Sequence, residues 1–168
     1  MKRTFLGRTP STGMITATFL VALVLEMLPW GNWPMPNFVA LILVFWNVFQ
    51  PRRVGISLAW LLGLLMDVHS GSLLGQQALA FSLLSYGAIA LHRRLLWYSV
   101  PAQALQLFPL FLLTHVVVAL VHLFFTGLTP SWSFFISPIL TALLWIPLTM
   151  WVLNHLNRSV NPAPAIGR

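Results

Sequence analysis

Long apolar stretches recur along the chain from Met14 to Leu156, and the basic residues occur only between these stretches or near the chain ends. Stretches of this kind are typical of helices that cross a lipid bilayer. The composition agrees, because 58% of the 168 residues are hydrophobic, only 7% are charged, and the mean hydropathy is +0.86. Soluble proteins rarely combine such a high fraction of apolar residues with so few charged residues. The sequence therefore predicts an all-α polytopic membrane protein.

Proline, glycine and basic residues divide the apolar region into six predicted spans. They cover about residues 14–28, 37–49, 54–68, 72–91, 102–125 and 134–156. The second and third are short, since a helix of about 13 residues reaches only about 20 Å against a hydrocarbon core of about 30 Å. Residues 1–160 are expected to form a single transmembrane domain, and the Pro-rich residues 161–168 a flexible tail.

The basic residues predict the orientation of these spans. All nine lie before the first span, in the second and fourth connections, or after the sixth span. They are Lys2, Arg3, Arg8, Arg52, Arg53, Arg93, Arg94, Arg158 and Arg168. The positive-inside rule assigns such positions to the cytoplasm, so both termini are expected there. The net charge of +7 then reflects membrane topology, and nucleic acid is not an expected partner.

Small residues recur at every fourth position of the third predicted span. They are Gly55, Ala59 and Gly63, and Asp67 follows at the next such position. In a helix these positions share one ridge, and a ridge of small side chains lets a second helix approach closely inside lipid. The ridge predicts a packing surface that ends at a carboxylate.

The turn after this span and the start of the next are also rich in small residues. Gly71 and Gly75 lie in the turn region, and Ala78, Ser82 and Ser85 follow at helical spacing. The third and fourth spans are therefore expected to form a tight antiparallel pair. We expect this small-residue hairpin to be the surface that recognises a partner.

Asp67 has two interpretations. An ionisable group within a membrane segment often has a functional partner, which suggests a ligand or proton site. A carboxylate just before a helix is also favoured by the helix dipole and the free N–H groups there, and this architectural role is preferred. Glu26, the other acidic residue, is expected at the membrane interface, and Ser70 and Ser72 as turn and N-cap residues of the fourth span.

The residues of ordinary catalytic sites are scarce. The chain has a single Asp, no cysteine and no Gly-x-Ser-x-Gly motif, and its one lysine is Lys2. His115 and His122 are seven residues apart, about 10 Å along a helix, too far to share a metal ion unaided. No enzyme activity, metal or cofactor is expected, although a histidine proton relay stays open.

The tryptophans divide into three predicted groups. Trp30, Trp33 and Trp132 are expected at the outer membrane interface. Trp46, Trp97 and Trp151 are expected at the inner membrane interface, where amphipathic rings are enriched. Trp60 and Trp145 fall near the middle of spans and are expected to pack between helices.

The region from about Met35 to Ile89 resembles MreD, a family of bacterial rod-shape-determining membrane proteins. The pieces that carry the resemblance are Pro36-Asn37 opening the second span, Phe45-Trp46 within it, Pro51 closing it, the Gly63-Leu64-Leu65-x-Asp67 run, and Gly71, Gly75 and Ala78-Leu79 after that run. The later spans match only in hydropathy.

The resemblance implies a non-enzymatic component of the bacterial inner membrane that serves lateral cell-wall elongation. Its implied partners are MreC as the direct one, with MreB, RodA and a class B penicillin-binding protein in the complex, besides membrane lipid. It also implies a fold similar to the substrate-binding subunits of energy-coupling-factor transporters. A vitamin-type substrate-binding subunit is therefore the alternative function, although the chain offers few polar groups for such a ligand.

Overall fold

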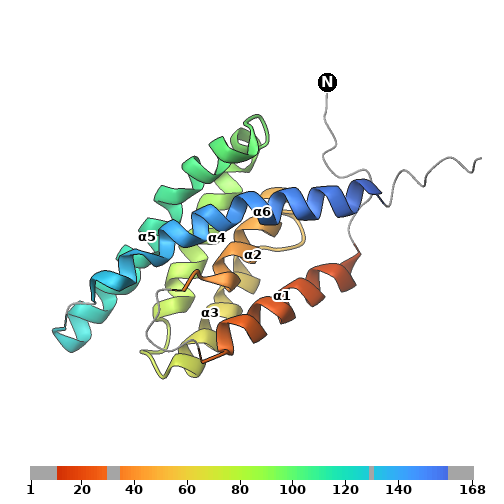
Figure 1. Cartoon of the computed structure of the whole chain (residues 1–168). Helices are drawn as coiled ribbons and strands as arrows, with labels where there is room; N and C mark the ends of the chain where they lie inside the picture. Colours follow the sequence, from red (N-terminus) through yellow and green to blue (C-terminus); the bar gives the residue numbers. More distant parts are fainter. Residues whose placement is uncertain (1–10, 30–34, 129–130, 159–168) are drawn as a thin grey trace, which may run out of the picture.

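The structure, a computed structural model, describes residues 11–29, 35–128 and 131–158. Within these ranges the secondary structure is all-helical, which confirms the all-α part of the prediction (Figure 1). The α-helices are α1 (Thr12–Met27), α2 (Phe38–Phe49), α3 (Ile56–Ser70), α4 (Gln76–Leu95), α5 (Val100–Thr126) and α6 (Ser137–Arg158), and a short 3₁₀ helix, η1 (Trp132–Phe135), precedes α6. Each α-helix contains most of one predicted span.

Apolar length differs greatly among these helices. In the described part of the chain, α5 is the one helix that is both long and apolar enough to cross a membrane on those two criteria. The helices α1, α2 and α3 and the first part of α6 are apolar but shorter.

Helix α2 forms the centre of the protein. Val39, Leu43, Val44 and Val48 on different sides of this helix are all buried. A helix that is apolar all round is stable only where other helices cover every side, and α1, α4 and α6 do so here.

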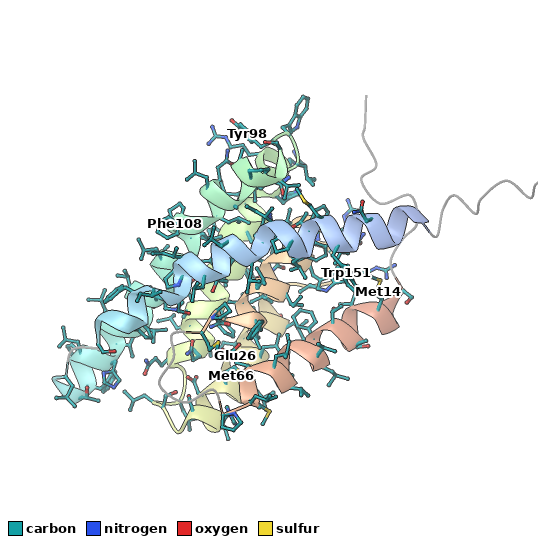
Figure 2. All side chains as sticks on the ribbon, in the orientation of Figure 1. Met14, Glu26, Met66, Tyr98, Phe108 and Trp151 are labelled. Atoms are coloured by element: carbon teal, nitrogen blue, oxygen red, sulfur yellow. The ribbon has the colours of Figure 1, made fainter. Side chains whose placement is uncertain are left out.

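The remaining helices pack as antiparallel neighbours around α2. The pair α3–α4 has the most extensive contact, followed by α5–α6 and α4–α5. The end of α1 and the α3–α4 connection lie at the lower side of the molecule in Figure 1. Figure 2 places Glu26 and Met66 at this side, which we call the acidic end because Glu26 and Asp67 both lie there.

The first residues of α1 and the last residues of α6 both lie at the right of Figure 1. Met14 and Trp151 mark this side in Figure 2. We call the end formed by the α2–α3 and α4–α5 connections the basic end. Arg52 and Arg53 lie in the α2–α3 connection, and Arg93 and Arg94 lie in the last turn of α4, just before the α4–α5 connection.

Two tryptophans lie differently from their prediction. Trp46 is buried in the core, and its Nε1–H donates a hydrogen bond of 2.8 Å to Thr18 Oγ1 on α1. Trp60 is 49% exposed, because it follows Ala59, which faces α4, and so points away from that helix. Trp145 packs between helices as predicted, and its Nε1–H donates to Gln103 Oε1 at 3.3 Å.

Candidate functional site

The closest contact between helices α3 and α4 lies at Gly63. A Cβ atom built on Gly63 would lie 2.5 Å from the backbone N of Ala78 and 2.6 Å from the backbone O of Gln77. Ala59 and Ala78 are fully buried beside this point. The two backbones therefore touch here, in the close approach that small residues allow inside lipid.

Gly55 does not belong to this contact, and the prediction that it continues the ridge is wrong. It is the N-cap of α3, and among the described residues no atom beyond its two chain neighbours lies within 4 Å of a Cβ built on it. The ridge therefore consists of Ala59, Gly63 and Asp67. Gly71 and Gly75 serve a different purpose, because both have positive φ angles (60° and 98°) that favour glycine in the turn between the helices.

Asp67 caps helix α4 from the end of helix α3. Its carboxylate is completely buried and accepts hydrogen bonds from the backbone N–H of Gly75 and of Gln77, both at 2.8 Å. The Ser72 hydroxyl donates to the same carboxylate at 3.0 Å, and the Ala78 N–H lies 3.4 Å away. The architectural role preferred from the sequence agrees with this geometry.

The start of α4 differs from the prediction for the same reason. The helix begins at Gln76, not near Ser72, and its N-cap is Gly75. Glycine has no side chain to accept from the first N–H groups, so Asp67 of the neighbouring helix supplies the oxygen atoms. Ser72 is therefore not the N-cap but a hydrogen-bond donor to Asp67.

Glu26 plays the same part in the first helical pair, which sequence reasoning missed. Its Oε2 atom accepts from the Phe38 N–H at 2.8 Å, at the start of α2. Asn37, the N-cap of α2, accepts from the Ala40 N–H at 2.7 Å and donates its own N–H to Thr141 Oγ1 on α6 at 3.0 Å. The signal that was missed is the position of the two acidic residues. Each lies in the last turn of one helix, and its carboxylate caps the next helix along the chain.

Removal of the Glu26 carboxylate should weaken the start of α2. Glu26→Ala is expected to lower the free energy of unfolding by about 1–2 kcal/mol, because the Phe38 N–H loses its partner in a partly buried position. Glu26→Gln retains an acceptor oxygen and should lose less than half as much. Chemical denaturation of the purified protein in micelles measures both, and equal losses would contradict a capping role.

The other residues singled out in the sequence surround the hairpin. Pro36 is buried before α2, Pro51 follows the end of that helix, and Ser82 is partly exposed with its hydroxyl bonded to the Ala78 carbonyl at 2.7 Å. The four arginines near the basic end are all exposed. They are Arg52, Arg53, Arg93 and Arg94.

The residues of this hairpin make packing and capping contacts between helices α3 and α4. Asp67 and Glu26 are the only acidic residues of the sequence, and both carboxylates accept from backbone N–H groups. Across the described ranges, no group of three or more His, Asp or Glu residues is placed to hold a metal ion. Gly63, Asp67 and Ala78 are buried between helices α3 and α4, so the outward side of this hairpin and its turn are the parts that remain accessible.

Comparisons with known proteins agree on one family. No solved structure matches the chain. A similar protein is the rod shape-determining protein MreD of Haemophilus influenzae, 29% identical over 153 residues, which cover 87% of this chain and 91% of that protein. The family described as rod shape-determining protein MreD matches residues 8–159. The chain therefore belongs to the MreD family, membrane proteins that determine rod shape, as the sequence resemblance indicated.

Proposed function

We propose that this protein is a non-enzymatic scaffold of the cell-elongation machinery in the bacterial inner membrane. In this role it binds MreC directly and links MreC to MreB, RodA and a class B penicillin-binding protein. The family's part in rod shape determination supports the proposal at the level of the process.

The observation that carries the non-enzymatic part is the use of the acidic residues. General acid–base or metal-assisted chemistry in such an apolar chain depends on ionisable side chains that are free to reach a substrate. Both carboxylates here are committed to helix capping, with Asp67 fully buried. The two carboxylates thus fix neighbouring helices relative to one another, as a scaffold requires.

The turn between α3 and α4 is the surface that we propose for MreC. Val68 and Leu74 on either side of the turn are 69% and 74% exposed. Exposed apolar side chains on a rigid turn suit recognition, because little conformational entropy is lost when a partner binds. The Asp67 hydrogen bonds supply that rigidity by joining the end of α3 to the start of α4.

The basic end would face the cytoplasm and MreB. The positive-inside rule supports this orientation, because every Lys and Arg of the sequence lies on one side if all six helices cross the membrane. Exposed Arg93 and Arg94 at the end of α4 are then available to cytoplasmic partners. The same arrangement would put both termini in the cytoplasm.

The alternative, a vitamin-type substrate-binding subunit, has less support. Such a site needs several polar groups that converge on a ligand. Near the acidic end, the oxygen atoms of Glu26, Asn37 and Asp67 already accept hydrogen bonds from backbone N–H groups. We therefore prefer the scaffold.

Site-specific photocrosslinking in rod-shaped cells that depend on this protein tests the proposed MreC surface. A photoreactive residue at Leu74 is expected to capture MreC, identified by immunoblot, because the side chain projects from the turn. The matched control is Leu105 on α5, which is 75% exposed but lies near the basic end of that helix. Absence of an MreC adduct at Leu74, or equal adducts at both positions, would reject this surface.

A further inference from the structure

A groove runs along the outward side of the α3–α4 pair, away from the turn. It is lined by Ile56, Ser57, Trp60 and Leu61 of α3 and by Ser82 of α4, and its volume is about 460 Å³. The small side chains of Ser57 and Ser82 leave space between the helices, and the larger apolar side chains form the walls of the groove. The Trp60 ring is half exposed within it.

The side chains of this groove suit a flexible apolar chain better than a helix. Helices associate inside lipid through small residues that permit close backbone approach. On α3 these residues are Ala59 and Gly63, and α4 already covers them. The outward side presents Trp60 and Leu61 instead, and a second helix would be held away by them, whereas an acyl chain can follow their contour.

A basic residue lies close in sequence to one end of the groove. Arg52 is exposed and precedes Ile56 by four residues, in the connection that leads into α3. A guanidinium group binds phosphate through two parallel hydrogen bonds, and cationic residues at the membrane surface attract anionic lipids. The connection that leads to the Ile56 end of the groove therefore carries a group that can bind phosphate.

We infer that the groove holds one acyl chain of an anionic phospholipid whose phosphate binds Arg52. The lipid would lie in the leaflet at the basic end of the protein, with its chain between Trp60 and Ser82. This site is separate from the turn proposed for MreC, which lies at the opposite end of α3. The proposed lipid site requires only that the outward side of the α3–α4 pair faces lipid.

Fluorescence quenching of Trp60 tests the inference on the purified full-length chain. The protein is reconstituted in phosphatidylcholine bilayers that contain brominated phosphatidylglycerol or, in parallel, brominated phosphatidylcholine. The difference between the wild type and Trp60→Phe isolates the signal of Trp60 from those of the other tryptophans. We expect brominated phosphatidylglycerol to quench Trp60 at about five-fold lower mole fraction than brominated phosphatidylcholine, the preference that one surface arginine confers.

Two variants identify the source of this preference. Arg52→Gln should abolish it, and Ser57→Leu should reduce quenching by filling the groove. The control Arg94→Gln removes the same charge from the last turn of α4, about 18 Å along the helix from Ser82, and should retain the preference.

Equal quenching of wild-type Trp60 by the two brominated lipids would overturn the inference. Equal loss in Arg52→Gln and Arg94→Gln would overturn it too, because the preference would then reflect overall charge. Neither result bears on MreC, since the experiment contains no other protein.

Discussion

Gly63→Ala is expected to cause the largest loss of stability among glycine-to-alanine substitutions in the part of the chain that the structure describes. The new Cβ atom would meet the backbone of Ala78 and the carbonyl of Gln77, so helices α3 and α4 would have to move apart along their whole contact. Overpacking of a core lowers the free energy of unfolding by about 1–3 kcal/mol. The loss for Gly63→Ala should lie at or above the upper end of that range, because backbone atoms, unlike a side chain, cannot rotate away from the new Cβ. Chemical denaturation in micelles and the cellular level of the variant measure the effect.

Two other glycines provide graded controls for this result. A Cβ atom on Gly87 would meet the end of the Leu110 side chain, which can change rotamer, so Gly87→Ala should cost about 1 kcal/mol. On Gly13, near the start of α1, the same atom would lie 3.9 Å from the Ser11 hydroxyl, and Gly13→Ala should be neutral or slightly stabilising. Equal effects at Gly63 and Gly87 would contradict a backbone contact at Gly63.

Asp67→Ala is expected to destabilise the protein by about 3–5 kcal/mol. The substitution leaves the N–H groups of Gly75 and Gln77 without their acceptor, and hydrogen bonds to a charged group each contribute about 1.5–3 kcal/mol. Asp67→Asn should cost about 2 kcal/mol, because one oxygen remains while the amide NH₂ faces a second donor. The free energy of unfolding of the two variants gives the comparison.

The same variants separate capping from a functional carboxylate. Ser72→Ala removes one donor to Asp67 and should cost about 1 kcal/mol, without loss of rod shape in cells. If Asp67 acts through capping, the loss of rod shape should follow the loss of folded protein across all three variants. Complete loss of rod shape in Asp67→Asn at normal protein level would instead indicate a direct functional role.

The sequence located the α3–α4 contact but not all of its members. Spacing of four residues correctly indicated Ala59 and Gly63, because a helix places such positions on one side. The same spacing wrongly included Gly55, since periodicity does not reveal that the helix begins one residue later. Trp60 was misplaced for a related reason, because composition does not identify which side of a span faces another helix.

The candidate site was also predicted only in part. A carboxylate before a helix suggested capping by Asp67, and the hydrogen bonds to Gly75 and Gln77 agree. Glu26 has the same role for α2, yet the start of that helix lies twelve residues further on, beyond a Pro-rich connection. Local sequence rules recognise caps within about one helical turn and therefore do not find this one.

The sequence by itself determined that the chain is an all-helical membrane protein of the MreD family, because hydropathy and short motifs are properties of the chain alone. Only the tertiary structure decided which residues face one another. It showed α2 enclosed by its neighbours, both acids joined to the starts of other helices, and Trp60 turned outward beside a groove. The physical reason is that burial and hydrogen bonding between helices depend on their relative rotation and depth, which a one-dimensional pattern does not specify.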